Sequence, residues 1–233
     1  MRLVWWSVDV NRKGGTGTGA KRRYRSPLRE QNARRTRQAV VQAATRLFVE
    51  HGYATTSLAD IAAAAEVARP TAFAAFGSKP ALLREVLNQA LAGDDEAVPV
   101  AQRPWFRPVW DATTPGAVLD AYAEVCTLIN GRAALLFEVV RRAADDSADV
   151  AELWETLKRN RRAGAAMVVN HLATLSPPAG GWDAERATDA VWIFNDPAHY
   201  DALVHQCGWD ESEYTTWTAG QMRHALRIEG GAN

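Results

Sequence analysis

The pattern of apolar and polar positions first becomes clearly helical over residues 28–51. Six apolar residues recur there at steps of three and four, which places them on one face of a helix: Ala33, Val40, Val41, Ala44, Leu47 and Phe48. Gly52 follows directly, and glycine is common just after the last turn of a helix. The pattern therefore predicts an amphipathic helix over residues 28–51.

Two shorter helices and a third run follow. Ser57 and Asp60 form the Ser-x-x-Asp pattern of a capping box, which predicts a helix that starts there and ends near residue 65. A second helix has Pro70 in its first turn, where the missing N–H costs little. Gly77 ends it, and Ser78 caps the run "KPALLREVLNQALA". Short helices joined by a tight turn predict a helix-turn-helix unit of about 60 residues.

Most of the remaining chain also has helical periodicity. Residues 93–116 contain several prolines and are predicted to form a loop. Beyond them the pattern predicts helices over residues 117–130, 132–147, 149–174, 183–195, 197–207 and 210–228. Alternating β-branched runs are few, so the predicted fold class is all-α.

Composition places the chain among ordinary globular proteins. It has 233 residues, of which 47% are hydrophobic and 23% are charged. Cys126 and Cys207 form no metal-like pair, which favours free thiols in a reducing compartment. No apolar run approaches the roughly 20 residues of a membrane span, and "MRLVWWSVDV" does not resemble a signal peptide. We expect a cytoplasmic protein without a membrane partner.

The formal net charge of zero hides a strong asymmetry. Residues 1–89 hold 15 Lys and Arg against 6 Asp and Glu, whereas residues 90–233 hold 12 against 21. Because the basic excess adjoins a helix-turn-helix pattern, double-stranded DNA is the favoured partner, ahead of a merely solvated tail. We predict three segments: a disordered basic arm (1–28), a helix-turn-helix DNA-binding domain with a linking helix (29–92), and a helical domain (93–233).

Residues 36–83 resemble the TetR (tetracycline-repressor) family of transcriptional regulators. The resemblance rests on "TRQAVVQAATRLFVEHGYATTSLADIAAAAEV" and "ARPTAFAAFGSKPALL". The family's spacing is matched by Gly52-Tyr53, Thr56-Ser57, Ile61-Ala62, Phe76 and Ser78-Lys79. The segment "GWDESEYTTWTAGQMRHAL" is similar to the last helix of many members.

The resemblance implies a homodimer that binds a palindromic operator, with a helical C-terminal domain for dimerisation and for an unidentified small-molecule effector. It implies a repressor that the effector releases from DNA. The dimer contact is expected from residues 183–195 and 210–228 as a two-fold four-helix arrangement. Their large apolar side chains exceed what one thin helical layer covers: Val191, Trp192, Phe194, Tyr214, Trp217 and Met222.

The expected recognition helix, "RPTAFAAF", departs from the family pattern. Glu66 replaces the usual turn glycine, Ala68 replaces a common serine, and Phe73 replaces a tyrosine whose hydroxyl reaches a phosphate. Arg69 and Thr71 are its only polar side chains, suited to a guanine edge and a thymine methyl respectively. Phe73 and Phe76 are expected to pack rather than to wedge into DNA, although Phe73 stays among the candidate contacts.

With so few donors on this helix, affinity is expected to depend on phosphate contacts and on the basic arm. Each phosphate that the arm neutralises adds about 0.9 to the magnitude of the slope of log affinity against log salt. Arg34 and Arg35 add long-range attraction. The predicted DNA-binding residues are Arg37, Thr56, Ser57, Arg69, Pro70, Thr71, Phe73 and Lys79.

The effector site is expected to be an apolar cavity among the middle helices. Candidate wall residues are Trp105, Phe106, Trp110, Tyr122, Cys126, Phe137 and Trp154. Arg161 and Arg162 suit an anionic ligand, but the run "KRNRR" is more typical of a solvated helix face.

No catalytic, cofactor or metal site is predicted. The five histidines lack metal-ligand spacing, and no nucleophile has a motif around it. Two alternatives remain at this stage: a DNA-binding regulator without a small ligand, and a helical enzyme or carrier with a degenerate N-terminal motif.

Overall fold

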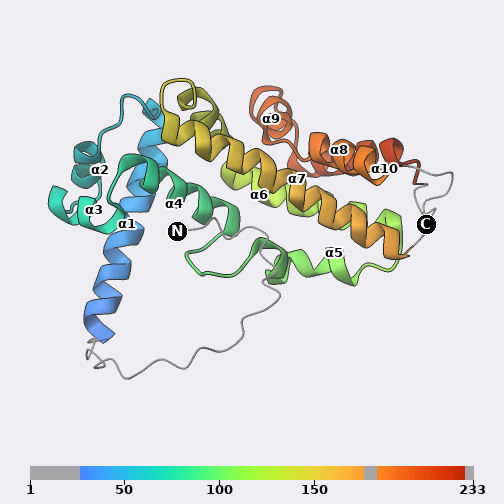
Figure 1. Ribbon diagram of the computed structural model, residues 1–233, viewed down its shortest axis with the longest axis horizontal. Coiled ribbons are helices and arrows are strands. Elements are labelled where there is room, and N and C mark those ends of the chain that lie inside the picture. The colour runs from blue at the N-terminus through green and yellow to red at the C-terminus, as the bar shows by residue number, and fades with distance from the viewer. Residues whose placement is uncertain (1–26, 176–182, 229–233) are drawn as a thin grey trace. The chain divides into compact units, whose positions relative to one another are not determined.

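The computed structural model describes residues 27–175 and 183–228, which fall into two compact units (Figure 1). One unit ends at Val86 and the other begins at Leu87, so the boundary lies within helix α4 (Lys79–Ala92). Every regular element in the described ranges is helical, which confirms the predicted all-α class. The predicted basic arm lies outside these ranges except for its last two residues, which begin helix α1 (Pro27–His51).

The first unit is formed by α1, α2 (Leu58–Ala64), α3 (Arg69–Phe76) and the first half of α4. Helix α2 packs against both α1 and α3. The buried apolar side chains of this unit include Val40, Val41, Ala44, Phe48, Ile61, Ala62, Ala72, Leu82 and Leu83. Four of the six apolar residues predicted to share a face of this helix are buried, whereas Leu47 is half-buried and Ala33 is exposed.

Helix α2 begins at the capping box predicted from the sequence. The Ser57 hydroxyl accepts a hydrogen bond from the Asp60 N–H at 3.1 Å, and the Asp60 carboxylate accepts one from the Ser57 N–H at 2.9 Å. The hydrogen bonds from Ser57 lower the pKa of Asp60. Two backbone donors at the helix start are therefore satisfied locally.

The turn between α2 and α3 is a Schellman motif with Glu66 in the left-handed conformation. Its φ is 55°, and its N–H donates to the carbonyl of Ala63 at 3.1 Å. The N–H of Val67 donates to the carbonyl of Ala62 at 3.0 Å, which closes the wider ring of the motif. The chain thus makes the turn without the glycine that usually permits it, at a conformational cost of about 1–2 kcal/mol.

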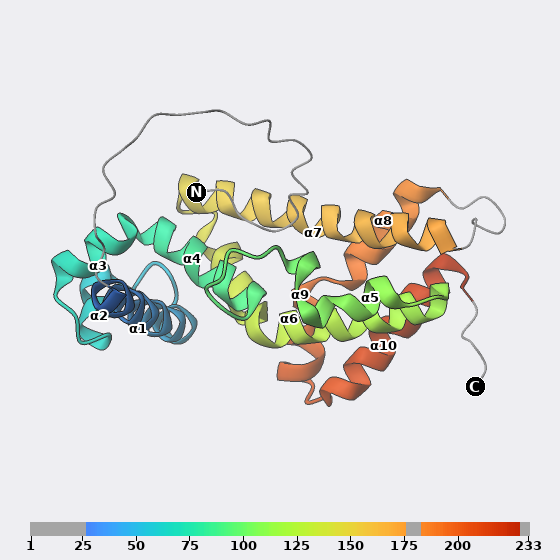
Figure 2. The same cartoon turned by 90° about the horizontal axis from the view of Figure 1, so that it is seen from below.

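The second unit is built around the long helices α6 (Pro115–Ala143) and α7 (Ala148–Leu175). Helix α10 (Glu211–Leu226) packs along α6, and α8 (Ala184–Phe194) packs against α7 and α10. Figure 2 shows α5 (Arg107–Asp111) also lying along α6. The core of this unit includes Phe106, Val109, Leu119, Tyr122, Val125, Val168, Val169, Val191, Met222 and Leu226.

Helix α6 runs without a break through Gly131, where the sequence pattern had predicted two helices. A glycine inside a helix costs only about 1 kcal/mol, which long apolar faces on both sides easily outweigh. A Cβ at this position would lie 3.1 Å from the Tyr200 hydroxyl and from Glu211 Oε1. Gly131 therefore permits a close approach of α9 (Pro197–Tyr200) and α10 rather than ending a helix.

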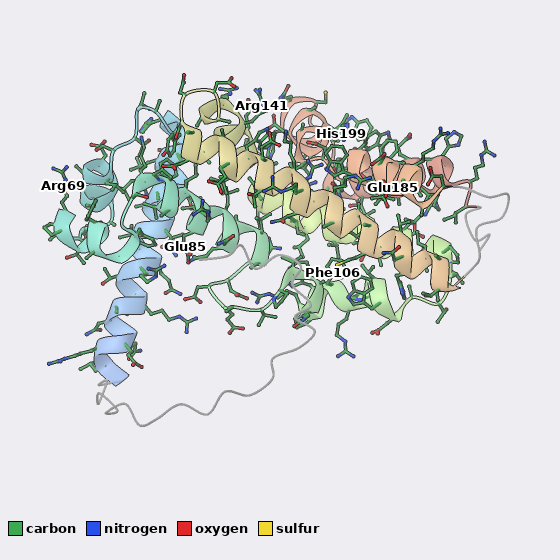
Figure 3. The ribbon with its side chains drawn as sticks, viewed as in Figure 1. Arg69, Glu85, Phe106, Arg141, Glu185 and His199 are labelled. Carbon is green, nitrogen blue, oxygen red and sulfur yellow. The ribbon has the colours of Figure 1, made fainter. Side chains whose placement is uncertain are left out.

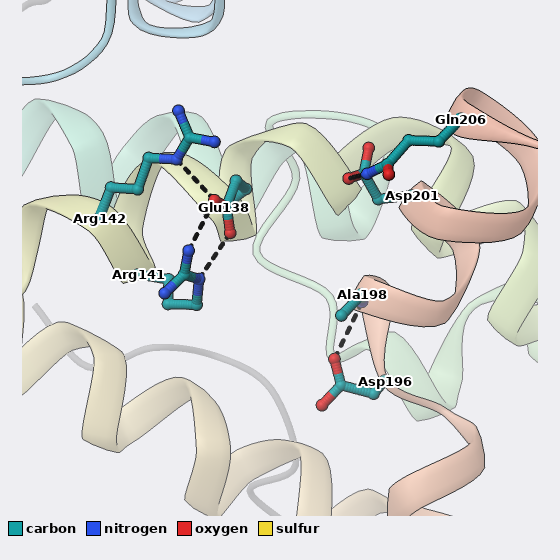
Figure 4. Close-up of polar contacts among 7 residues, drawn as sticks. All are labelled: Glu138, Arg141, Arg142, Asp196, Ala198, Asp201 and Gln206. Atoms are coloured by element: carbon teal, nitrogen blue, oxygen red, sulfur yellow. Dashed lines mark hydrogen bonds and ion pairs between the residues drawn. The ribbon is translucent and has the colours of Figure 1, made fainter.

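Near its C-terminal end, α6 carries a local charge cluster. Glu138 accepts hydrogen bonds from Arg141 and Arg142, with N–O distances of 2.6–2.8 Å (Figure 4). These contacts lower the pKa of Glu138 to about 2, with the Arg141 hydrogen bond as the largest cause. Cations in a last helical turn also interact favourably with the helix dipole.

The connecting segments contain short helical turns where the sequence predicted an open loop or one longer helix. The first are η1 (Val100–Gln102), η2 (Pro104–Phe106) and α5. Arg103 is buried and holds this segment by donating to Asp94 and to the carbonyls of Glu96 and Val98. After α9 the chain continues as a π-helical turn, η3 (Asp201–Gln206), in which Gln206 donates to Asp201 (Figure 4). No helix in the described ranges is long and apolar enough to cross a membrane.

The left-handed residue at the α2–α3 turn generates a stability prediction. Glu66→Gly should raise the free energy of unfolding by about 0.5–1 kcal/mol, because relief of the left-handed cost exceeds the extra chain entropy of glycine. The measurement is urea unfolding of the full chain. Glu66→Ala is the matched control, since it removes the charge but keeps a Cβ in the left-handed region. A Gly variant no more stable than the Ala variant contradicts the prediction.

Candidate DNA-binding surface and ligand cavity

One side of helix α3 is exposed to solvent. Arg69 begins the helix, as labelled in Figure 3. The buried Ala72 faces inward and fixes which side of α3 is exposed. We call the exposed residues of this helix the α3 face: Arg69, Pro70, Thr71, Phe73 and Ala74. This face combines one guanidinium and one hydroxyl with three apolar side chains.

The two phenylalanines of α3 have different environments. Phe73 has 58% of its surface exposed, so the expectation that it packs inside the unit is wrong. Phe76 is half-buried, and the Arg37 guanidinium lies 4.3 Å from its ring centroid. The sequence could not distinguish them, because burial of Ala72 turns the helix so that Phe73 faces outward.

Arg37 connects α1 to the end of α3. Its Nη1 donates to the carbonyl of Ala75 at 2.6 Å, and its Nη2 lies 3.5 Å from the Glu85 carboxylate. Arg37 thereby satisfies one of the free carbonyls at the C-terminal end of a helix. In this arrangement the side chain is engaged within the unit, and its predicted DNA contact stays a prediction.

Lys79 and Thr56 are also engaged internally. Lys79 Nζ donates to the carbonyls of Tyr53 at 2.9 Å and Thr56 at 3.0 Å, and it lies 4.2 Å from the centroid of the Tyr53 ring. Partial burial lowers the pKa of Lys79. The buried Thr56 hydroxyl donates toward the carbonyls of Gly52 and Leu47. Both residues therefore hold the turn before α2, whereas Ser57 beside them is exposed.

The second unit contains a cavity of about 40 Å³. Four of the seven predicted wall residues line it: Phe106, Tyr122, Cys126 and Phe137. The remaining wall residues are Leu91, Val125, Ile129, Asn130, Arg161, Asn195 and Pro197. The structure thus brings together residues of α4, α6, α7 and the α8–α9 corner.

The three tryptophans among the candidates lie outside this wall. Trp110 stacks on Phe106 with ring centroids 5.0 Å apart and donates its indole N–H to the carbonyl of Ala101. Trp105 packs on the same core, and Trp154 meets Phe137 edge-on at 6.4 Å. Trp110 and Trp154 therefore support cavity residues from behind rather than facing the cavity.

A chain of hydrogen bonds runs along the polar part of the wall. Arg161 donates to Asn195 Oδ1 from Nε at 3.2 Å and from Nη2 at 3.0 Å. Asn195 Nδ2 in turn donates to the Tyr122 hydroxyl at 2.9 Å. Burial raises the pKa of the Tyr122 hydroxyl and that of the neighbouring wall residue Cys126, the latter to about 12. These four polar side chains, Arg161, Asn195, Tyr122 and Cys126, are therefore buried among apolar residues.

Arg161 also interacts with the corner between α8 and α9. Its Nη1 lies 2.9 Å from Asp196 Oδ2, and its Nη2 donates to the carbonyl of Trp192 at 3.1 Å. The other carboxylate oxygen of Asp196 caps α9 by accepting from the Ala198 N–H (Figure 4). The charge of Arg161 is therefore balanced by a specific carboxylate.

The expectation that Arg161 belongs to a solvated face is wrong. Arg161 is only 6% exposed, whereas Arg162 lies toward solvent and pairs with Glu185 and Asp189. A signal in the sequence could have separated them. Arg161 is four residues after Leu157 and four before Ala165, so it continues the buried face of α7.

Asn130 and Asn195 were not identified from the sequence. Single asparagines in helical runs carry no distinctive pattern, and each acquires its place only when distant helices pack together. Asn195 and Tyr122 are 73 residues apart in the chain. Within the described ranges, no group of three or more His, Cys, Asp or Glu side chains is arranged to hold a metal ion.

Comparison with protein families agrees with the geometry of the first unit. Residues 40–86 match the family model described as "Bacterial regulatory proteins, tetR family". This range contains α2, α3 and the turn between them, together with the buried half of α1. No curated protein sequence matches the chain.

Solved structures with the same fold cover most of the chain at low identity. A putative TetR-family regulator from Syntrophomonas wolfei has a TM-score of 0.66 and 16% identity, over 87% of this chain and all of that one. A putative transcriptional regulator from Pseudomonas aeruginosa PAO1 has a TM-score of 0.63 and 16% identity, over 85% and 92%. The fatty acid degradation regulator FadR from Bacillus halodurans has a TM-score of 0.60 and 13% identity, over 86% and 96%.

The family match and the fold agree on one assignment. The matched residues form the helix-turn-helix unit with its exposed α3 face, and the helical remainder has the fold of TetR-family structures. The family is not enzymatic, which removes the alternative of a helical enzyme. Residues 40–86 thus belong to the tetR family of bacterial regulatory proteins, and the chain as a whole has the fold of solved TetR-family regulators.

Proposed function

We propose that this regulator is a repressor that binds a palindromic operator as a homodimer and leaves it when a small molecule occupies the cavity. The observation that carries the proposal is the combination, in one chain, of an exposed α3 face and a partly polar cavity in a separate unit. The α3 face suits a DNA major groove, and the cavity suits a small-molecule effector.

Base reading is assigned to the α3 face. Arg69 offers two parallel donors to the O6 and N7 atoms of guanine, and Thr71 offers a methyl group and a hydroxyl. Exposed Phe73 has no hydroxyl for a phosphate, so its proposed role is apolar contact with a thymine methyl group. Pro70 adds a second apolar surface at the helix start.

Phosphate binding is assigned to Ser57, to the start of α3 and to the third N–H of Lys79. Two of the Lys79 donors bind backbone carbonyls, which leaves one for a phosphate. Arg37 and Thr56 act indirectly, because their hydrogen bonds hold the ends of α3 and of the α1–α2 turn. The basic residues of the predicted arm supply attraction that is independent of sequence.

The homodimer contact is assigned to α8 and α10. Val191, Tyr214 and Met222 are fully buried within their own unit, so they no longer support this contact. Ile193 is 49% exposed on α8, and Trp217 on α10 is partly exposed. A Cβ at Gly220 would meet nothing within 4 Å, so α10 has an open surface there for a second chain.

Arg69→Ala should weaken binding to the preferred site by about 1–3 kcal/mol and relax the preference at one base pair. The site is first selected from random duplexes by the full-length protein, and affinity is then measured by fluorescence anisotropy. Arg107→Ala, which removes an exposed charge from α5, is the matched control and should leave the affinity unchanged. Equal losses on selected and random duplexes for Arg69→Ala would show a phosphate contact instead. Failure to select any sequence contradicts the proposed function.

Thymine methyl groups should contribute to recognition by Phe73. Replacing a contacted thymine with uracil removes only the methyl group, and the wild-type protein should lose about 0.8 kcal/mol for each contacted methyl. The affinity of Phe73→Ala should not change when the thymine that Phe73 contacts, one in each half-site, is replaced with uracil. The measurement is anisotropy on duplexes substituted one thymine at a time. Equal sensitivity of wild type and variant at every position rules out the contact.

Light scattering should give a mass of twice the 25.5 kDa of one chain for the wild type, and the mass of one chain for Ile193→Asp. At a two-fold contact the new carboxylate of each chain would lie close to that of the other chain. The dimer would then be destabilised both by desolvation of the two charges and by their repulsion. Leu128→Asp places the same charge on an exposed leucine of α6 and should remain dimeric. A monomeric wild type contradicts the proposed assembly, and a dimeric Ile193→Asp variant contradicts its location.

A further inference from the structure

The wall of the cavity contains one charged side chain among the described residues, and its charge is already balanced. Arg161 binds Asp196 through Nη1, and its Nε and Nη2 donate to Asn195 and to the carbonyl of Trp192. Four of its five N–H groups thus have protein partners. An anionic ligand would have to compete with Asp196 and bring a second negative charge into apolar surroundings, which is costly.

The same contacts fix which way the Asn195 amide points. Arg161 Nε and Nη2 both donate to Asn195 Oδ1, so the amide oxygen must face Arg161. The amide nitrogen, Nδ2, therefore faces Tyr122. The Tyr122 hydroxyl therefore accepts from Asn195 and must donate its own proton in another direction. Cys126 lines the same cavity, but sulfur is only a weak acceptor. A ligand oxygen in the cavity, as a better acceptor, would accept a hydrogen bond from the Tyr122 hydroxyl.

The remainder of the wall sets the size and polarity of the occupant. It is mostly apolar, with Phe106, Ile129 and Phe137 among its side chains. A volume of about 40 Å³ gives room for only a few non-hydrogen atoms, at roughly 10–15 Å³ for one water-sized sphere. Asn130 is the only other polar side chain of the wall, and its amide donates weakly to Tyr214 at 3.4 Å.

We propose that the cavity binds a small uncharged molecule with an apolar body and one acceptor oxygen, such as a ketone or ester carbonyl. This oxygen accepts a hydrogen bond from the Tyr122 hydroxyl. Arg161 and Asn195 act as positioning residues, since they orient Tyr122 without touching the acceptor. The inference rests on the proposed function in taking this cavity as the effector site.

Three probes of equal size separate the possible chemistries. They are methyl propyl ketone, the alkene in which a methylene group replaces the ketone oxygen, and butanoate. Binding to the full-length dimer or monomer is measured by ligand-observed NMR titration. The ketone should bind most tightly and the alkene about threefold to tenfold more weakly, as expected for one hydrogen bond. Butanoate should be the weakest of the three.

Two variants test the roles of named groups. Tyr122→Phe should bind the ketone and the alkene equally, whereas the control Tyr200→Phe, which removes a hydroxyl bonded to Glu211, should keep the wild-type preference. Asp196→Asn retains the cap of α9 but leaves Arg161 without its carboxylate. This variant should gain about tenfold or more in butanoate affinity relative to the ketone.

The outcomes are decisive in both directions. The inference is overturned if wild type binds butanoate as tightly as the ketone, if Tyr122→Phe keeps the ketone preference, or if none of the probes binds. Because the Asp196→Asn result is a gain of binding, it does not depend on a damaged fold. Operator binding is measured separately by anisotropy, so a wrong ligand class with intact DNA binding leaves the rest of the proposed function standing.

Discussion

The buried guanidinium of Arg161 is the interaction on which the second unit most depends. It joins α7 to the corner between α8 and α9 through Asn195, Asp196 and the carbonyl of Trp192. Removing one partner of such a pair leaves an uncompensated charge, which costs about 3–5 kcal/mol in a fully buried site and less here, because Asp196 is partly exposed. An apolar residue would fill the space more cheaply. It would not orient Asn195, and so would not direct the Tyr122 proton.

The first unit uses its cations in a related way. Arg37 and Lys79 donate to backbone carbonyls at the end of α3 and in the turn before α2. The carbonyl of Ala75 lies in the last turn of α3, where intrahelical donors run out, so a side-chain donor takes their place. The position of α3 is fixed by contacts on the side opposite to the α3 face, such as that of Arg37 with the Ala75 carbonyl. The α3 face can therefore consist mainly of apolar side chains and still have a defined position.

The sequence predicts the fold well where local chemistry determines it. The Ser57–Asp60 capping box is a local feature and occurs as predicted. The apolar face of α1 is local too, and it is buried from Val40 to Phe48 but not at Ala33. Gly131 was misread as a helix end because its role is to admit Tyr200 and Glu211, which are distant in the chain. The same limit applies to the cavity. Aromatic residues in helical runs are plausible wall residues, but packing alone decides that Phe106 faces the cavity and Trp110 stands behind it.

The charge asymmetry of the sequence overstates the charge that is available to DNA. Of the cations in the basic half, Arg37 and Lys79 are largely engaged by carbonyls and by aromatic rings. Arg69 on α3 is exposed, as are Arg34 and Arg35 on α1. A cation within a recognisable DNA-binding motif is thus not evidence of a phosphate contact until its internal partners are known. Because a lysine has three donors and two carbonyls engage only two of them, Lys79 can serve both the fold and a phosphate, and loss of its side chain would affect the two together. A weakened variant at Lys79 would therefore report on the α1–α2 turn as much as on DNA, whereas a variant at exposed Arg69 would leave that turn unchanged.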